Sequence, residues 1–307
     1  MRVIRHPRAD GPGTAIAIGS FDGVHLGHQA ILGLVKDAAS ARGLASAVLT
    51  FEPLPREFLA PANAPARLSS LPEKILALQA LGIDLAFVQR FYARFAAREP
   101  ADFARWLHGN LGARHVTIGA DFRFGAHRAG NAQRLAELGA ELGFEVEVLK
   151  AVKQAGERIS STRVRAALAS GDLDEAARLL GRPYAICGRV QHGAKRGREL
   201  GFPTANIRLG RARPALGGVF AVKCTGAATR GLEGVASLGI NPAVQTGGPA
   251  TLEAFFFDFH GDLYGRRLTL EFHKKLRDEA HFASLDALVA QIRKDCDEAR
   301  EYFGTRG

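Results

Sequence analysis

The amino-acid sequence predicts an α/β part with a parallel sheet, followed in the same chain by a part built mainly from antiparallel strands. Three observations support this fold class. Strand-like apolar runs alternate with helical patterns in the first half, which is typical of a parallel sheet covered by helices. Short strands follow one another closely in the second half, between turns rich in Gly and Pro, which favours a closed antiparallel barrel. The length of 307 residues suits two domains of ordinary size.

Hydrophobic periodicity gives the elements of the first half. A strand over Ala15–Ile18 leads through a Gly-rich turn into a helix with Ile31, Leu32 and Val35 on one face. The next predicted elements are strand Ala45–Phe51, helix Pro72–Leu81, strand Leu85–Gln89, helix Ala101–Leu111, strand His115–Gly119, helix Asn131–Leu142 and strand Phe144–Leu149. Open sheets bind ligands beyond the carboxyl ends of their strands, so we expect a site at the Gly-rich turn and at the loop Asp121–Gly130.

The second half begins after a predicted helix over Leu173–Leu180, and we place the domain boundary so that residues 1–183 form one domain and 184–307 the other. The predicted strands beyond it are Ala185–Gln191, Gly218–Cys224, Gly234–Leu238, Leu252–Phe257 and Leu268–Phe272. A last helix over Ser284–Phe303, capped by Ser284, carries an apolar stripe that would pack against the barrel.

Composition favours a globular protein over a disordered or membrane-spanning one. Hydrophobic residues make up 47% of the chain and charged residues 23%, which is typical of soluble domains. The first residues lack the apolar core of a signal peptide, and no later segment has the apolar length of a membrane span, so we expect a cytoplasmic protein. Three widely separated cysteines, Cys187, Cys224 and Cys296, predict reduced structural thiols.

The net charge of +10 raises nucleic-acid binding as an alternative function, because a basic surface attracts phosphate. This alternative depends on charge alone, since the sequence has no ribonucleoprotein-type motif, zinc finger or recognition helix. Much of the excess lies between Arg182 and Arg213, where several basic residues flank glycines. Apart from ordinary solvated charge, that pattern suits a small polyphosphate, so we expect small-molecule partners, no nucleic acid and no membrane. The sequence leaves homo-oligomer formation open.

The turn Gly19–His28 has the features of a phosphate site. The first N–H groups of a helix lack internal partners and the helix dipole favours an anion there. Gly23 and Gly27 allow close approach of the backbone, and His25 and His28 can both donate to one polyphosphate. A zinc pair is the alternative, but no third ligand of suitable spacing follows. The expected phosphate contacts in this turn are Gly19, Phe21, Asp22, Gly23 and Gly27.

Two further segments are candidates for phosphate binding. Ile159 is followed by hydroxyl side chains at the start of a predicted helix, with Arg165 one turn in, although a purely structural helix cap is the alternative. The second segment is Gly201–Asn206, for which turn chemistry alone is the alternative.

Several motifs in the same order give the chain a resemblance to a known family. The turn with His-x-Gly-His and the stretch Ile-Ser-Ser-Thr-x-x-Arg resemble the paired signatures of nucleotidyltransferases that transfer AMP. The full set resembles the bacterial bifunctional riboflavin kinase/FAD synthetase, from about Thr14 to Phe303; it adds Gly119–Gly125, Leu180–Tyr184, Gly201–Asn206 and Phe257–Phe259. The resemblance implies a Rossmann-like nucleotidyltransferase domain, followed by a six-stranded antiparallel riboflavin kinase barrel with a terminal helix.

For the first domain the resemblance implies that FMN and ATP give FAD and pyrophosphate. The phosphate of FMN is already ionised at neutral pH, so no protein base is required. His25 and His28 would stabilise the α-phosphate, Arg165 would take the pyrophosphate, and Ser161 and Thr162 would bind phosphates. The residues implied to hold the flavin are Asp121, Phe122 and Phe124, although two such phenylalanines can equally face a core.

For the second domain the resemblance implies that riboflavin and ATP give FMN and ADP. The nucleophile is now a neutral hydroxyl, which gains from a base, and Glu253 matches the family's carboxylate. Thr204 and Asn206 would bind Mg²⁺ with the ATP phosphates. The implied flap over the nucleotide contains Gly188, His192, Gly193, Lys195, Gly197 and Arg198.

The sequence departs from the family pattern at two positions. Phe255 and Asn241 stand where relatives often have a polar and a basic residue, which bears on the grip on riboflavin or ADP. A chain with only one active half is therefore the alternative to a bifunctional enzyme.

Overall fold

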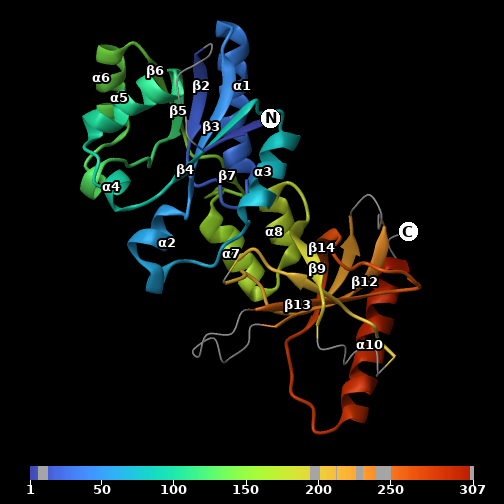
Figure 1. Cartoon of the computed structure of the whole chain (residues 1–307). Helices are drawn as coiled ribbons and strands as arrows, with labels where there is room; N and C mark the ends of the chain where they lie inside the picture. Colours follow the sequence, from blue (N-terminus) through green and yellow to red (C-terminus); the bar gives the residue numbers. More distant parts are fainter. Residues whose placement is uncertain (6–12, 194–200, 212, 226–230, 240–249, 305–307) are drawn as a thin grey trace. The chain divides into compact units, whose positions relative to one another are not determined.

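The structure is a computed structural model that describes residues 1–5, 13–193, 201–211, 213–225, 231–239 and 250–304 (Figure 1). The chain divides into two compact units. The first unit comprises Met1–Pro65 and Lys74–Ser160, and the second comprises Ala66–Glu73 and Ser161–Gly307. The domain boundary at 183/184 stays a prediction.

The first unit is built on a parallel sheet, as predicted. Its described strands are ordered β1-β4-β3-β2-β5-β6, and every neighbouring pair is parallel. The strands are β1 (Arg2–Ile4), β2 (Thr14–Ile18), β3 (Ala45–Glu52), β4 (Leu85–Arg90), β5 (Ala113–Gly119) and β6 (Glu145–Leu149). Five of them agree with the sequence prediction, whereas the edge strand β1 was missed because it has only three residues, two of them exposed.

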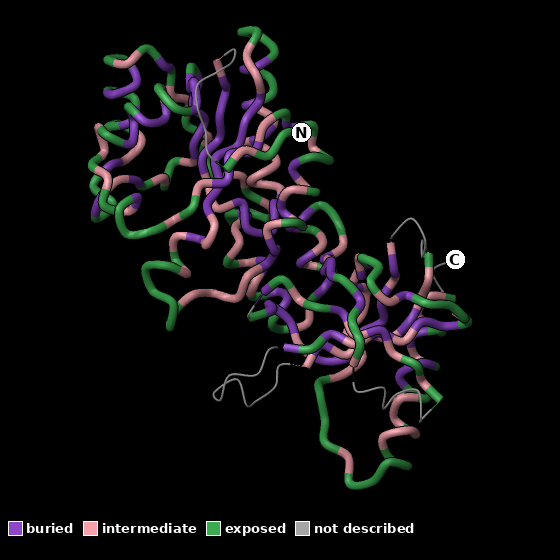
Figure 2. Tube along the Cα trace, in the orientation of Figure 1, coloured by how far each residue is buried: buried purple, intermediate pink, exposed green. Residues whose placement is uncertain are grey.

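Helices cover both faces of this sheet, and each face has its own apolar core. Helices α1 (Leu26–Arg42) and α3 (Leu71–Ala80) contribute to the core that includes Ala15, Ala17 and Val48. Helices α5 (Pro100–Leu111) and α6 (Ala132–Leu142) contribute to the core on the other face, which includes Ile16 and Ile18. The alternation along β2 therefore divides its side chains between the two cores. Buried residues follow the central strands, and exposed residues gather on the helices (Figure 2).

Short elements lie between the main ones. They are α2 (Pro55–Leu59), α4 (Ala93–Ala96), the 3₁₀ turns η1 (Pro61–Asn63) and η2 (Ala126–Arg128), and the hairpin strands β7 (Lys153–Gln154) and β8 (Glu157–Arg158). None of them has an apolar period that the sequence alone would reveal.

The second unit contains two helices and a closed barrel. Helices α7 (Ser161–Ser170) and α8 (Leu173–Leu180) lead into the barrel, whose described strands close in the order β10-β13-β12-β11-β14-β9 with antiparallel pairs throughout. The strands are β9 (Tyr184–Gln191), β10 (Ala205–Arg208), β11 (Gly218–Cys224), β12 (Leu232–Gly239), β13 (Thr251–Phe256) and β14 (Arg267–Arg277). The predicted barrel is confirmed.

One prediction in the barrel is corrected. The motif Pro-Thr-Ala-Asn predicts a turn at Asn206, but this residue lies in β10, where it pairs with Gln191 of β9 on one side and Glu253 of β13 on the other. The strand has only four residues and follows a proline, so its sequence resembles a turn.

The last helix, α10 (Leu285–Gly304), packs against the barrel as predicted. Its buried Asp295 accepts hydrogen bonds of 2.8 to 3.0 Å from Arg277 of β14. Burial raises the pKa of the Cys296 thiol to about 11, with a further contribution from the charge of Asp295, which favours the unreactive thiol form. All three cysteines are buried and free.

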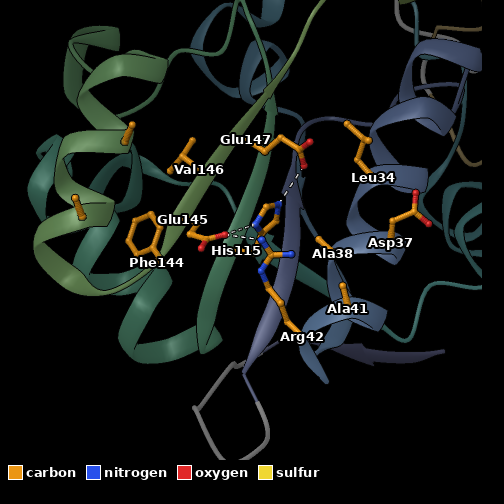
Figure 3. Close-up of a pocket in the computed structure, with 12 residues that line it drawn as sticks. Leu34, Asp37, Ala38, Ala41, Arg42, His115, Phe144, Glu145, Val146 and Glu147 are labelled. Carbon is orange, nitrogen blue, oxygen red and sulfur yellow. Dashed lines mark hydrogen bonds and ion pairs between the residues drawn. The ribbon is translucent and has the colours of Figure 1, made fainter.

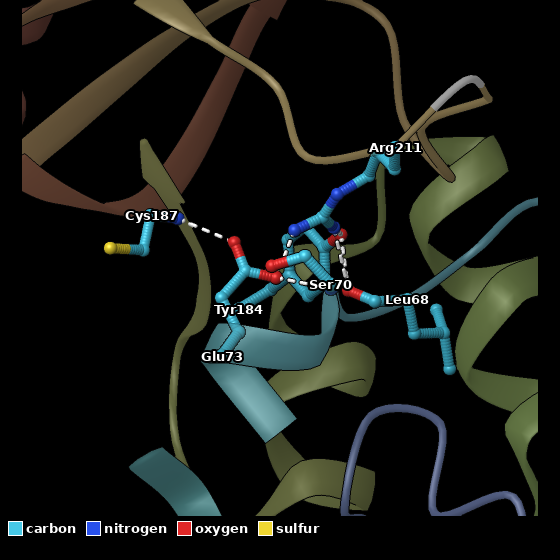
Figure 4. A network of polar contacts seen from close by, with 6 residues as sticks. All are labelled: Leu68, Ser70, Glu73, Tyr184, Cys187 and Arg211. Carbon is cyan, nitrogen blue, oxygen red and sulfur yellow. Dashed lines mark hydrogen bonds and ion pairs between the residues drawn. The ribbon is translucent and has the colours of Figure 1, made fainter. Parts of the chain in front are cut away.

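A buried polar network joins the segment Ala66–Glu73 to the barrel within the second unit (Figure 4). The guanidinium of Arg211, whose side chain is 0% exposed, forms an ion pair with Glu73. It also donates to the Tyr184 hydroxyl at 2.7 Å, while the Cys187 backbone N–H donates to Glu73 at 2.6 Å. Because both charges are paired and hydrogen-bonded, their burial is tolerated.

We expect Arg211→Met to destabilise the second unit by about 3–5 kcal/mol, because it leaves the nearly buried Glu73 carboxylate without its counter-charge. Urea unfolding followed by hydrogen exchange of the β9 amides measures this loss. Fluorescence of Trp106, the single tryptophan, reports the first unit in the same samples. Arg208→Met, at an exposed position of β10, is the control and should change little. An equal loss of unfolding free energy in both variants would contradict the stabilising role of the ion pair between Arg211 and Glu73.

No helix in the described residues has both the length and the apolar character that crossing a membrane requires.

Candidate active sites

The turn after β2 has an unusual backbone that brings it to the amino end of α1. Phe21 and Val24 have positive φ angles of 48° and 44°, and Gly23 has a φ of 86°. His25 is the N-cap of α1, and its Nδ1 accepts a hydrogen bond from the His28 backbone N–H at 3.3 Å. A neutral His25 must therefore carry its ring proton on Nε2.

The two histidines predicted to act together are in contact. Their rings are stacked, with centroids 3.7 Å apart and planes inclined by 16°. The Nδ1 atom of His28 is buried and makes no hydrogen bond to any described residue. Burial lowers the pKa of His28 well below its usual value, and the charges of His25, Lys74 and Arg158 lower it further. His28 is therefore a neutral imidazole in the free protein at neutral pH.

Glycines and a buried acid complete the turn. A Cβ on Gly27 would lie 3.2 Å from the His25 ring and 3.4 Å from the Ile159 carbonyl oxygen, so backbone and ring approach closely here. A Cβ on Gly19 would lie 3.2 Å from the Phe21 ring. Asp22 is only 2% exposed, which turns its carboxylate away from solvent.

The candidate residues of α7 lie in the second unit. The helix begins at Ser161, and Thr162 is exposed. The Nε of Arg165 donates to the Ala66 carbonyl oxygen at 2.5 Å, so this side chain is held by the segment before α3.

The loop after β5 places its candidate residues differently from one another. Asp121 forms an ion pair with Arg158 of β8 at 2.9 Å, and this hydrogen bond lowers the pKa of the Asp121 carboxyl. Phe124 is 6% exposed and packs on Phe103 with a centroid distance of 5.2 Å, so it faces the core. Phe122 is half-buried and stacks on Phe124 at 5.6 Å.

Exposed aromatic residues lie near the ends of β3 and β4, where the sequence predicts no site. Phe58 of α2 and Tyr92 after β4 are each 39% exposed, and Leu59 is 62% exposed. Phe58 packs edge-on against Phe91 at 5.7 Å. The sequence marks these residues only as apolar residues in Pro-rich segments without periodicity. In the structure they lie at the carboxyl edge of the sheet, where ligands bind.

A hollow of about 730 Å³ lies at the other end of the strands, between α1, β6 and α6 (Figure 3). His115, near the start of β5, points into it and contacts Glu147 at 3.1 Å and Glu145 at 3.5 Å. Arg42 of α1 pairs with Glu145 at 2.6 Å. These side chains are separated from the histidine pair by the length of the strands.

In the barrel, the predicted base lies beside the predicted magnesium ligands. Glu253 of β13 is directly opposite Asn206 of β10, and the Thr204 hydroxyl donates to Glu253 Oε2 at 3.2 Å. A Cβ on Gly193 would come within 2.4 Å of the Asn206 side chain, so the backbone of the predicted flap passes close to it. The remaining flap candidates Lys195, Gly197 and Arg198, and also Asn241, lie outside the described residues.

A pocket of about 290 Å³ adjoins Thr204. Apolar side chains, among them Phe256, Phe259 and Leu263, line much of it. The ring of Tyr264 lies 4.0 Å from that of His192. Phe255 packs edge-on against Phe202 at 5.4 Å, so the departure from the family pattern contributes an aromatic contact.

Comparison with protein families finds two matches that together cover most of the chain. Residues 8–163 match the FAD synthetase family, and residues 180–303 match the riboflavin kinase family.

Whole-length relatives carry both activities in their names. A bifunctional riboflavin kinase/FMN adenylyltransferase of Pseudomonas fluorescens is 45% identical over 301 residues, which cover 98% of this chain and 96% of that protein. Its counterpart in Escherichia coli strain K12 is 43% identical, with 99% and 98% covered. A crystal structure named a macrolide-efflux protein, from Streptococcus pneumoniae, is 28% identical with a TM-score of 0.80, and the match covers 97% of this chain and 98% of that one.

Proposed function

Because the chain belongs to the bifunctional riboflavin kinase/FMN adenylyltransferase family, we propose that its two reactions use separate sets of side chains. The protein phosphorylates riboflavin with ATP to FMN, and transfers AMP from ATP to FMN to give FAD and pyrophosphate. The first reaction needs a base and the second does not. The proposal assigns Glu253 to the kinase reaction and His25, His28 and Arg165 to adenylyl transfer.

In adenylyl transfer the protein must stabilise charge rather than remove a proton. The FMN phosphate attacks the α-phosphorus of ATP, and negative charge on the phosphoryl oxygens is stabilised by donors held in place. We assign this role to the His25 ring, at the N-cap of α1, and to the amino end of that helix. His28 starts neutral, and the negative charge of bound ATP raises its pKa, so we propose that it gains a proton as ATP binds.

The other assignments for this reaction come from the family motifs. We assign Arg165 to the pyrophosphate, and Ser161 and Thr162, with the backbone of the turn, to the ATP phosphates. For the flavin we keep Asp121 and Phe122, whereas Phe124 supports the loop from the core. The domain limits proposed with these roles are 1–183 for adenylyl transfer and 184–307 for the kinase.

The kinase assignment rests on one observation: Glu253, Thr204 and Asn206 are neighbours in the barrel wall. Glu253 would accept the proton of the riboflavin hydroxyl as that oxygen attacks the γ-phosphorus of ATP. The Thr204 hydroxyl donates to Glu253 and so orients the carboxylate. Riboflavin has a large planar aromatic ring system, which fits the aromatic side chains that line the adjoining pocket.

The magnesium ion would be held by Thr204 and Asn206. Both supply neutral oxygen atoms, which Mg²⁺ accepts together with phosphate oxygens and water. When bound, the ion would neutralise charge on the ATP phosphates. The carboxylate of Glu253, hydrogen-bonded to Thr204, adds negative charge that favours a cation.

We expect Asn206→Leu to lower FMN formation by about 10²-fold and to raise the magnesium concentration needed for half-maximal rate, because one oxygen ligand is lost. Asn206→Asp keeps an oxygen at this position and is the matched control, so its magnesium requirement should not rise. FMN-to-FAD conversion should be unchanged in both. Chromatographic assay of the two half-reactions across a magnesium series measures this, and a parallel loss of FAD formation in a folded variant would refute the assignment.

Partners are small molecules in this proposal. ATP, riboflavin and FMN are sufficient substrates, and we propose a cytoplasmic enzyme that needs neither nucleic acid nor membrane.

A further inference from the structure

A buried lysine lies behind the phosphate-binding turn. Lys74 of α3 is 1% exposed, and its Nζ donates to the Thr50 hydroxyl at 3.0 Å. Lysine side chains are almost never fully buried unless they are paired. Neither the hydrophobic period of α3 nor any motif in the sequence marks this residue.

Lys74 and Thr50 form a short relay to the turn. Thr50 lies near the carboxyl end of β3, is 0% exposed, and donates its hydroxyl to the Ser20 carbonyl oxygen at 3.2 Å. The residues that precede Ser20 and Thr50 are also hydrogen-bonded: the Gly19 N–H donates to the Leu49 carbonyl oxygen at 3.1 Å. The start of the turn is thus fixed to β3 by two hydrogen bonds, and one of them continues to the ammonium group.

The charge of Lys74 acts on the same place. The positive charge of Lys74 opposes protonation of His28, as do the charges of His25 in the turn and Arg158 of β8. The turn also contains one buried acidic residue, Asp22. A positive charge inside the protein interacts more strongly with a nearby anion than one in water, because the surrounding dielectric constant is lower. A polyphosphate bound at the turn would therefore be attracted by the Lys74 ammonium group, which Thr50 already holds in place.

We propose that Lys74 is a positioning residue for adenylyl transfer, which fixes the turn through Thr50 and Ser20 and supplies a positive charge behind the ATP phosphates. This inference rests on the proposed role of the turn as the ATP site of the FMN-to-FAD reaction. Lys74 itself need not touch the nucleotide. Its two contributions, the hydrogen bond and the charge, can be separated by mutation.

The test compares Lys74→Met, Lys74→Arg and Thr50→Val in the full-length protein. Lys74→Met removes charge and hydrogen bond, and we expect kcat/KM for ATP in FAD formation to fall about 10²-fold. Thr50→Val keeps the charge, and Lys74→Arg replaces it, so both should lose at most about 10-fold. FMN formation from riboflavin, which belongs to the second unit, should be unchanged in all three, and the fluorescence of Trp106 serves as the control for folding of the first unit.

A second readout separates electrostatics from simple support. The His28 ring is titrated by NMR in each variant, and its signal is identified by its absence in His28→Ala. Removing the positive charge favours the protonated ring, so the titration midpoint of His28 should move to higher pH in Lys74→Met and stay in place in Thr50→Val and Lys74→Arg.

Three results would overturn the inference. They are an unchanged FAD-forming rate in Lys74→Met, an unchanged His28 midpoint in that variant, and an equal loss in Lys74→Arg and Lys74→Met. If Lys74→Met does not fold, Lys74→Arg and Thr50→Val decide: a loss of about 10²-fold in a folded Lys74→Arg also refutes it. Full FAD formation by His28→Ala would instead refute the role of the turn itself, so the two failures are distinguishable.

Discussion

Glu253→Gln should stop FMN formation while FMN-to-FAD conversion continues at the normal rate. The amide has nearly the same shape as the carboxylate but cannot take the proton of the riboflavin hydroxyl, and loss of a general base costs about 10²–10⁴-fold. The Thr204 hydroxyl can still donate to the amide oxygen, so the wall formed by β10 and β13 should keep its geometry. Separate assays with riboflavin and with FMN as the starting flavin measure the two rates.

Glu233→Gln is the matched control for this change. Glu233 is another carboxylate of the barrel, on β12, where it pairs with Lys223 at 3.2 Å on the surface. Its replacement should leave FMN formation within about two-fold, since exposed ion pairs contribute about 0–1 kcal/mol. Normal FMN formation by folded Glu253→Gln would remove the base from the proposed mechanism.

His28→Ala should have the opposite effect, lowering FAD formation by about 10²–10³-fold with FMN formation intact. The half-buried ring packs against His25 and Phe21, and it is the one whose protonation bound ATP would favour. Chromatography of FMN and FAD after reaction with ATP gives the rate, and ATP binding measured in buffers of different ionisation enthalpy gives the proton uptake. At a pH between the pKa of His28 in the free protein and its pKa in the ATP-bound protein, we expect the variant to show both a lower rate of FAD formation and a smaller proton uptake.

His281→Ala provides the comparison, because His281 is exposed and lies outside either proposed site. It should retain both activities and the proton uptake. If His28→Ala formed FAD normally, or lost FMN formation as well while remaining folded, the proposed separation of the two reactions would be wrong.

The main elements were predictable from the sequence because their apolar residues repeat with a clear period. β2 and β3 are almost wholly buried runs, and Leu32 and Val35 mark the buried face of α1. β10 was missed because four residues that follow a proline give too short a pattern. Local signals fail where pairing with distant strands decides the structure.

In the candidate site of the first unit, some residues were predictable from the sequence and others were not. Motifs identified His25 and His28, and the stacked contact between them follows from their spacing at a helix start. No local pattern could have found Lys74, because its burial depends on Thr50, which is 24 residues away. The core position of Phe124 likewise depends on Phe103 in a different helix.

The ion pair of Arg211 with Glu73 has a consequence for any attempt to divide this enzyme at the sequence boundary between its two catalytic domains. A cut after residue 183 would put Glu73 on one fragment and Arg211 on the other. Each fragment would then contain a buried charged side chain without its partner. The carboxyl-terminal fragment would also lack the segment Ala66–Glu73, which belongs to the second unit but lies more than a hundred residues upstream in the sequence. Severed halves should therefore regain the kinase fold most fully when they are expressed together.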